Sequence, residues 1–157
     1  MMTPIPSSAG SQQRRVKTEE LERARSIVAG RVEEAFDVLR RMPDRERSML
    51  AKGERGREWP VMLHQAFEHA AHQGIKIRLP PPSAAQITRM HEVLAWMLEL
   101  AIREPGYAKV VYLVHGKRFG TMRVARIVGI DKKTVARWLA AGLTLVVVDI
   151  SRRKSAA

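Results

Sequence analysis

The segment "TMRVARIVGIDKKTVARWLA", residues 121–140, constrains the fold more than any other part of the chain. Small and aliphatic residues recur in it at helical spacing on both sides of a glycine, which predicts two short helices joined by a turn. Gly129 stands where the chain must reverse, because glycine adopts a positive φ at little cost. Asp131 can cap the second helix through its carboxylate. The segment therefore predicts a helix-turn-helix.

The apolar residues of this segment predict how its two helices pack. Ala125 is the small residue at the expected point of closest approach, and a preceding helix over residues 107–115 completes the three-helix form of the motif. The residues expected to face the core are Val124, Val128, Ile130, Val135 and Trp138.

The positions left facing outward predict what this unit binds. The N-terminal residues of a recognition helix meet base edges in the DNA major groove, where arginine can bind guanine O6 and N7 together. We expect five residues of the second helix to read bases: Lys132, Lys133, Ala136, Arg137 and Ala140. We expect four cations before that helix to contact the DNA backbone: Lys117, Arg118, Arg123 and Arg126.

Positive charge is concentrated in the same part of the chain. The formal net charge of the 157 residues is +12. Residues 107–157 contain 11 Lys and Arg against only Asp131 and Asp149, so most of the excess lies in the last third. Such asymmetry favours a polyanionic partner, which we take to be double-stranded DNA. The alternative is that the cations form a solvated face and that the unit binds protein.

The sequence does not support an enzyme, a cofactor-binding protein or a metal-binding protein. There is no cysteine, which excludes disulfides and thiolate sites. No glycine-rich phosphate loop, nucleophile elbow or paired-carboxylate pattern is present, so we predict a protein that is not an enzyme and needs no cofactor. His64, Glu68 and His72 share a face of an expected helix, but this spacing is weak evidence for a metal site and we predict none.

The hydropathy pattern predicts a cytoplasmic protein that does not contact membranes. No continuous apolar run approaches the roughly 20 residues of a membrane span. The first residues, "MMTPIPSSAGSQQRRVK", are polar and lack the apolar region of a secretory signal.

Helical periodicity in the rest of the chain predicts a mainly α-helical protein. Thr18 and the acidic residues after it predict a helix that starts at Glu19 and ends at Arg41. Ser83 and Gln86 form a capping-box pattern before a second long helix. Its apolar stripe, which must be buried, consists of Ile87, Met90, Leu94, Met97 and Ala101. Between these helices we expect short helices over residues 44–51 and 61–73 and an extended segment over 75–79.

The carboxyl-terminal sequence also resembles known DNA-binding units. "AKVVYLVHGKRFGTMRVARIVGIDKKTVARWLAAGL", residues 108–143, is similar to the C-terminal helix-turn-helix of bacterial sigma factors and to homeodomain-like units of phage regulators. With "WPVMLHQAFEHA" and "RLPPPSAAQITRMHEVLAWM" before it, the chain resembles uncharacterised phage and prophage proteins of alphaproteobacteria that end in such a unit. The resemblance implies a phage or bacterial origin and a role linked to DNA. Together with the outward-facing cations, it leads us to expect a sequence-specific transcriptional regulator.

Two other functions use the same motif and stay open as alternatives. A small terminase subunit recognises DNA for packaging, although such proteins usually carry the motif at the amino terminus. A sigma-like adaptor binds RNA polymerase through this fold. A homodimer is compatible with any of the three functions.

We therefore expect four parts in the chain: a disordered tail over residues 1–17, a helical scaffold or dimerisation region over 18–106, the helix-turn-helix unit over 107–150 and a basic tail over 151–157. Residues 143–150, "LTLVVVDI", fit two structures. Their β-branched side chains favour a strand, whereas the resemblance implies that the last helix continues.

Overall fold

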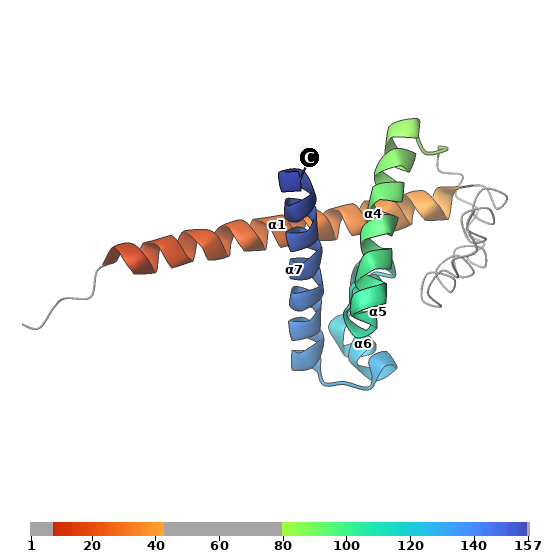
Figure 1. Ribbon diagram of the computed structural model, residues 1–157. Coiled ribbons are helices and arrows are strands. Elements are labelled where there is room, and N and C mark those ends of the chain that lie inside the picture. The colour runs from red at the N-terminus through yellow and green to blue at the C-terminus, as the bar shows by residue number, and fades with distance from the viewer. Residues whose placement is uncertain (1–7, 43–79, 157) are drawn as a thin grey trace, which may run out of the picture.

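The computed structural model describes residues 8–42 and 80–156, and every regular element in these two ranges is helical (Figure 1). The mainly α-helical class is therefore confirmed. The segments expected over residues 44–51, 61–73 and 75–79 lie outside the described residues. The elements are α1 (Ser8–Arg41), α4 (Ala84–Arg103), α5 (Pro105–Val111), the π-helix η1 (Tyr112–Gly116), α6 (Thr121–Val128) and α7 (Lys132–Ala156).

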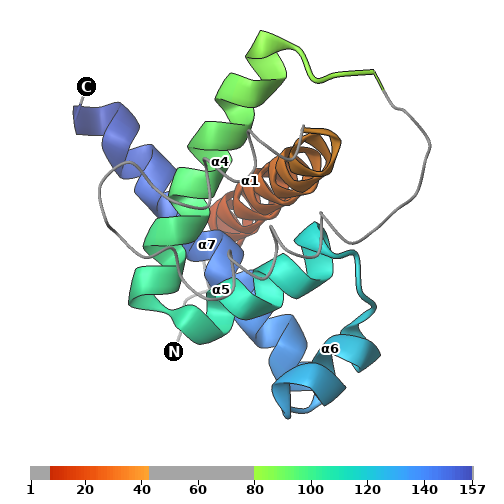
Figure 2. The same cartoon turned by 90° about the vertical axis from the view of Figure 1, so that its right-hand side faces the viewer.

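Helix α1 lies across the other helices. In Figure 1, α4 and α7 cross it at a steep angle, and the view along its axis in Figure 2 shows α4, α5 and α7 gathered around it. Among residues 14–41, whose burial is described, the buried apolar residues of α1 lie in its second half, from Val28 to Leu39, and the buried Met42 follows directly after the helix. The first half extends away from the body as a single helix (Figure 1).

Helix α1 begins earlier than the sequence predicted. We expected a disordered tail over residues 1–17, but residues 8–17 are helical. Apart from Gly10 this stretch has no helix-breaking residue, and its Ala, Gln, Arg and Lys residues are good helix formers. Thr18 is consequently an interior residue, and its hydroxyl donates to the Arg14 carbonyl at 2.9 Å.

Helix α4 begins as predicted. The Ser83 hydroxyl accepts a hydrogen bond from the Gln86 N–H at 3.3 Å, and the Gln86 side chain accepts one from the Ser83 N–H at 3.0 Å. These reciprocal bonds form the expected capping box. The predicted stripe faces the core, with Ile87 partly buried and Met90, Leu94, Met97 and Ala101 buried.

The buried side chains form one core that passes through all the helices. Val38 and Leu39 of α1 and Val110 and Val111 of α5 belong to this cluster, and α4 contacts both α1 and α5, which in turn contacts α7. The expected scaffold and the expected C-terminal unit therefore share a core.

Helix α7 includes the segment that the sequence left open. Residues 143–150 are helical, and the helix continues through the expected basic tail as far as Ala156. Leu143 and Val146 are buried, and packing against α1, α4 and α5 outweighs the small helix preference that β-branched residues lose.

By length and composition α7 is also long and apolar enough to cross a membrane, which differs from our reading of the sequence. The relevant window has a mean hydropathy of 1.5, and 22% of it is buried within the described structure. The core helix of a soluble protein satisfies the same criterion, so this property assigns no location.

Candidate nucleic-acid interface

Helices α6 and α7 meet through a tight turn at one end of the molecule (Figure 1). Gly129 ends α6 in the left-handed conformation, with a φ of 77°. The N–H groups of Gly129 and Ile130 donate to the Ala125 carbonyl at 2.9 and 3.1 Å. This pair of bonds is typical of a helix that ends in a left-handed glycine. The prediction that Gly129 reverses the chain is confirmed.

Asp131 caps the start of α7, as predicted. Its Oδ1 atom accepts a hydrogen bond from the Thr134 N–H at 3.0 Å. Hydrogen bonding by the side chain and backbone of Thr134 lowers the pKa of Asp131, and the nearby charge of Arg137 lowers it further. The carboxylate therefore stays ionised at neutral pH and holds the first turn of α7 in place.

The expected packing of this segment is also present. Val124 of α6 and Val135 of α7 are completely buried. The other expected contact residues are partly buried against the same core: Ala125, Val128, Ile130 and Trp138. The direction of α6 relative to α7 is thus fixed by buried aliphatic side chains.

Helix α5 holds α7 through contacts that sequence reasoning missed. The rings of Tyr107 and Trp138 meet edge to face, with centroids 5.7 Å apart. A Cβ atom on Gly106 would lie 3.0 Å from Trp138, and one on Gly142 would lie 3.0 Å from Val111. Two small residues thus allow α5 to lie directly against α7. No local signal in the sequence identified either glycine as a packing position, because the partner of each lies on the other helix.

The residues predicted to read bases lie in the first turns of α7. Lys132, Lys133, Ala136 and Arg137 are exposed, whereas Ala140 is half-buried at the edge of the body. The structure gives neither lysine an ion pair with another described residue. Arg137 donates to the Thr134 hydroxyl at 3.1 Å, which keeps its guanidinium beside the first turn. Four of the five predicted side chains are therefore accessible together.

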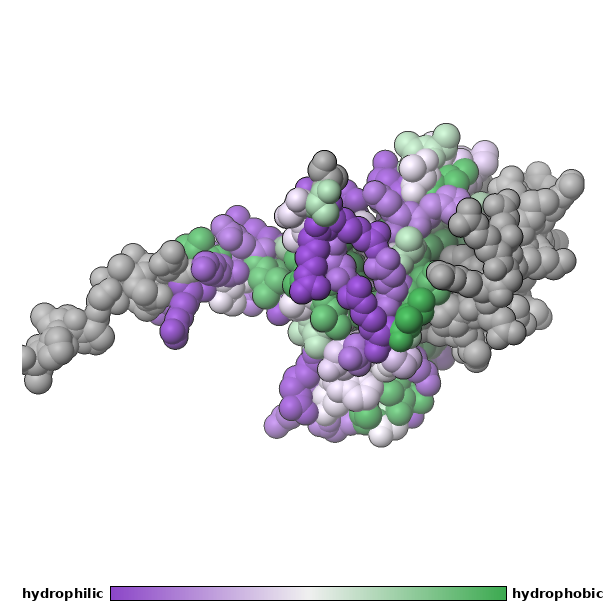
Figure 3. Space-filling model, in the orientation of Figure 1, coloured by the Kyte–Doolittle hydropathy of each residue, from purple (hydrophilic) through white to green (hydrophobic). Residues whose placement is uncertain are grey.

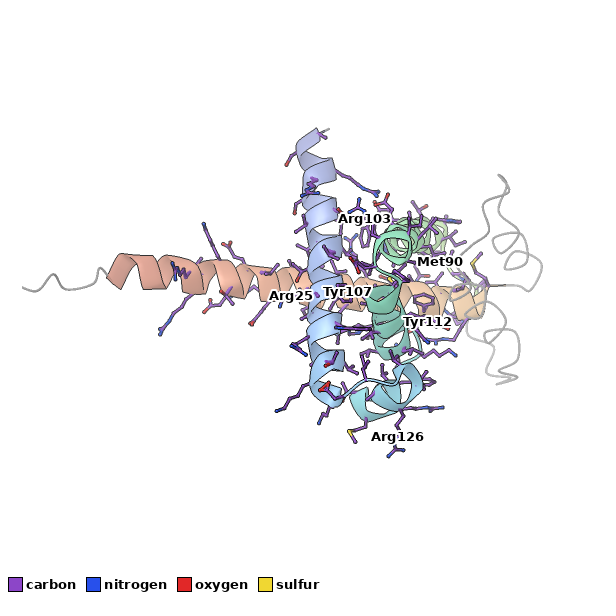
Figure 4. All side chains as sticks on the ribbon, turned by 60° about the horizontal axis from the view of Figure 1, so that its bottom comes forward. Arg25, Met90, Arg103, Tyr107, Tyr112 and Arg126 are labelled. Atoms are coloured by element: carbon purple, nitrogen blue, oxygen red, sulfur yellow. The ribbon has the colours of Figure 1, made fainter. Side chains whose placement is uncertain are left out.

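Two of the four predicted backbone-contact residues are accessible on α6. Arg123 is exposed and stacks on the Phe119 ring, with its guanidinium carbon 3.8 Å from the ring centroid. Arg126 is exposed and points away from the body (Figure 4). Arg126 lies in the last turn of α6, next to the turn that leads into α7, whereas Arg123 lies near the start of α6.

The other two, Lys117 and Arg118, are occupied by contacts to the body. The Lys117 ammonium lies 5.7 Å from the Tyr112 ring centroid and 5.6 Å from that of Phe119. Burial lowers the pKa of Lys117, and the charge of Arg123 adds to the effect. Arg118 donates to Asp37 at 2.5 Å. These cations are less available to a ligand than the sequence suggested, because Arg118 pairs with an acidic residue of α1 and Lys117 lies over the rings of two nearby aromatic residues.

Two exposed apolar side chains on α6 were not singled out from the sequence. Met122 is 56% exposed and Ile127 is 45% exposed. They share the outer surface of α6 with Arg123 and Arg126, and Figure 3 shows apolar and hydrophilic side chains next to each other at this end. Their position off the stripe formed by Val124 and Val128 was the available signal.

Among the described residues, acidic side chains are nearly absent from the α6–α7 end of the molecule. Elsewhere carboxylates pair with arginines across helices, as in Glu34 with Arg89 at 2.9 Å and Asp149 with Arg103 at 2.9 Å. Residues 117–140 contain seven Lys and Arg but only one acid, Asp131, which is bound to the α7 cap. The α6–α7 end is therefore a positive surface whose cations are mostly not neutralised by the described chain.

No group of His, Asp and Glu within residues 8–42 and 80–156 is suited to hold a metal ion. His64, Glu68 and His72 lie outside the described residues.

Comparison with known proteins adds a family. Residues 40–146, more than half of the chain, match the family described as "Domain of unknown function (DUF6362)". The matched range includes α4, α5, η1, α6 and the first part of α7. No curated protein and no solved structure matches the chain.

Proposed function

The chain belongs to the DUF6362 family, and we propose that it binds double-stranded DNA through its α6–α7 end. In this proposal α6 and α7 act as a helix-turn-helix, and the helical segment formed by α5 and η1 precedes them as the third helix of the unit. The proposal depends mainly on one observation: Lys132, Lys133 and Arg137 are exposed together on a helix start that a cap and a buried turn hold in place.

The electrostatics of the α7 start support an anionic ligand. Cations in the first turn of a helix oppose the helix dipole, which favours negative charge there. Lys132 and Lys133 occupy this turn without an ion-pairing partner among the described residues. A phosphate backbone close to both lysines would offset this local cost, and the backbone N–H groups of a helix start also favour phosphate.

Each of the predicted cations has a place in the proposed complex. Lys132, Lys133, Ala136 and Arg137 face base edges in the major groove, and the two lysines, at the helix start, also lie close to the phosphates that border the groove. Ala140 is the last residue of α7 that we assign to the groove contact. Arg123 and Arg126 bind phosphates beside it, and Lys117 and Arg118 stabilise the connector instead. Arg152 lies about 30 Å along α7 from Lys132, at a rise of about 1.5 Å per residue, so we do not assign the far end of α7 to this interface.

The biological role that fits this reading best is sequence-specific transcriptional regulation in a phage or a prophage-bearing bacterium. It is supported by the resemblance of residues 108–143 to sigma-like units. In this role the protein is cytoplasmic, takes no cofactor and has no enzymatic activity of its own.

A second candidate function is supported by the apolar side chains on α6. Met122 and Ile127 are exposed beside Arg123 and Arg126, a mixture that is common where one protein binds another. An adaptor that binds RNA polymerase would use this face of α6 rather than the start of α7. DNA binding therefore depends mainly on the residues at the start of α7, whereas binding to RNA polymerase would depend on the outer face of α6.

Selection of bound fragments from a random duplex pool distinguishes these functions. We expect the full chain to enrich a defined motif, and Lys133→Ala/Arg137→Ala to lose that enrichment. The matched control is Arg152→Ala/Lys154→Ala, which removes the same charge from exposed residues at the other end of α7 and should enrich the same motif. Retention on RNA polymerase together with no enrichment by the unmodified chain would favour the adaptor.

A further inference from the structure

The first half of α1 presents a helix face that contacts nothing else in the described chain. Residues 14–27, which we call the α1 arm, extend from the body in Figure 1. Val16 and Ile27 on this arm are 52% and 62% exposed. A single helix that projects into water is only marginally stable, because most helix stability in proteins comes from packing of an apolar face. The arm therefore lacks the packing that usually maintains such a helix.

The two sides of the arm differ in their surroundings. One side turns toward the body, where Leu21 and Ala24 are half-buried and Arg25 donates to the Thr144 hydroxyl of α7 at 2.8 Å. The other side is exposed, and its residues recur at steps of four, three and four, so they share one line along the helix. We call this line the arm stripe; it consists of Val16, Glu20, Arg23 and Ile27.

The arm stripe is complementary to itself when a second copy runs in the opposite direction. A twofold axis between positions 21 and 22 places Val16 opposite Ile27 of the second copy, because both lie equally far from the axis. The same axis places Glu20 opposite Arg23 of the second copy. Each pair occurs twice, as a twofold interface requires. A parallel arrangement would instead place Glu20 beside its own copy.

We propose that the arm stripe binds a second copy of this chain as an antiparallel helix pair. The steps of four and three match the repeat by which two helices pack side by side. The apolar pairs lie at both ends of the contact and the ion pairs lie in the centre. A polar pair within such a seam selects one register at some cost in stability. Charge complementarity thus specifies both the partner and its direction.

The surroundings of the stripe limit the contact to the arm. Beyond Ile27, Arg31 pairs with Glu92 of α4 at 3.7 Å, and Glu34 pairs with Arg89 of α4 at 2.9 Å. Because Arg31 and Glu34 pair with residues of α4, the exposed arm stripe ends at Ile27. About three helical turns of each copy remain for the contact, which predicts a reversible dimer rather than a permanent one.

Sedimentation of the full chain without DNA tests this proposal. The unmodified chain should show a concentration-dependent monomer–dimer equilibrium. Glu20→Arg and Arg23→Glu should each raise the dimer Kd by about tenfold or more, since each replaces two attractive pairs by two repulsive ones. The matched controls Glu22→Arg and Arg15→Glu make the same charge changes on exposed arm residues off the stripe, and they should change the Kd by less than about twofold.

Mixing the two stripe variants gives the decisive result. A Glu20→Arg chain and an Arg23→Glu chain have complementary stripes, so the equimolar mixture should dimerise again although neither variant does alone. An effect within one helix could not be rescued in this way. The proposal is overturned by an unmodified chain that stays monomeric up to about 100 µM, by controls that act like the stripe variants, or by a mixture that stays monomeric. None of these outcomes involves DNA, so they leave the proposed function untouched.

Discussion

Arg137 and Arg126 are both exposed arginines near the turn, but they differ in what surrounds them. Arg137 donates to Thr134 and lies in the second turn of α7, close to the cap at Asp131. Arg126 lies in the last turn of α6 and points away from the body (Figure 4). In the proposed complex the first reads a base and the second binds a phosphate, so the two side chains affect binding differently.

We predict that Arg137→Ala weakens binding to the selected site by ~1–3 kcal/mol and relaxes the preference at one base pair. Arg126→Ala should weaken binding to selected and scrambled duplexes alike and reduce the slope of log K against log salt by about one phosphate contact. Fluorescence anisotropy with both duplexes at several salt concentrations measures these effects. Equal loss of preference in the two variants would show that Arg137 does not read a base.

Residue positions were predictable from the sequence where local spacing decides them. The exposure of Lys133 and Arg137 follows from their place opposite the buried Val135 on the same helix, and Lys132 is the first residue of that helix. The contacts of Lys117 and Arg118 were not predictable. Arg118 pairs with a residue 81 positions away, and Lys117 lies over aromatic rings that the connector brings together.

At the scale of the elements, the α6–α7 turn depends on the backbone of Gly129. Its φ of 77° is disfavoured for other residues, although no atom lies within 4 Å of a Cβ atom placed there. We predict that Gly129→Ala lowers the free energy of unfolding by about 1–2 kcal/mol through backbone strain alone. Denaturant unfolding of the purified variants measures this change.

Gly30 provides the matched control for this substitution. It lies inside α1 and a Cβ atom placed on it also meets nothing within 4 Å, but its φ is not positive. Gly30→Ala should therefore raise the free energy of unfolding by roughly 0.5–1 kcal/mol, because alanine suits a helix interior better. Stabilisation by both substitutions would mean that the left-handed turn is not essential to the fold.

The cap of α7 predicts a dependence of stability on pH. The pKa of Asp131 is lowered in the folded chain, so its stabilising effect is fully present above its ordinary value of 3.8 and is lost as the pH falls through the lower folded value. Asp131→Asn keeps a capping side chain that does not titrate. We therefore expect the unfolding temperature of the natural chain to fall relative to that of Asp131→Asn as the pH drops below 3.8. A constant difference down to pH ~2 would exclude a role for the ionised cap.

Element starts and stops were predictable where a local signal encodes them. Ser83 with Gln86, Gly129 and Asp131 each act within a few residues of the helix end that they determine. The length of α7 was ambiguous, because Val146 favours a helix only when it is buried against other elements. The early start of α1 was missed because residues 8–17 are helix formers but lack a strong start signal.

At the scale of the whole molecule, the proposed DNA-binding end and the α1 arm combine into one assembly. A twofold dimer would present two α6–α7 ends related by symmetry, and such proteins select DNA sites with matching symmetry. We therefore predict that fragments selected by the full chain are palindromic. The Glu20→Arg variant, which should be mostly monomeric at low protein concentration, should protect only one half of such a site from cleavage in footprinting. An asymmetric selected motif would show that the two ends do not bind DNA as a pair.

One hydrophobic core connects the α6–α7 end with the helix that carries the α1 arm. Which helices pack against each other in this core could not be derived from sequence periodicity. The stripe of α4 predicted burial, but nothing in it indicated that α1 would lie across both α4 and α7. The close contact of α5 with α7 depends on Gly106 and Gly142, whose meaning becomes clear only when the helices are placed together. Sequence periodicity thus predicted the helices and their buried faces, whereas tertiary packing decides their partners.

The central claim is that the start of α7, rather than the general positive charge of the chain, binds duplex DNA. The most direct test is the salt dependence of duplex affinity for Lys132→Ala/Lys133→Ala and for Arg152→Ala/Lys154→Ala, which remove equal charge from opposite ends of the same helix. We predict that the first variant loses about tenfold or more in affinity and shows a salt slope shallower by about two contacts, while the second keeps the affinity and slope of the natural chain. Equal losses in the two variants, or no duplex binding by the natural chain at low salt, would contradict the account.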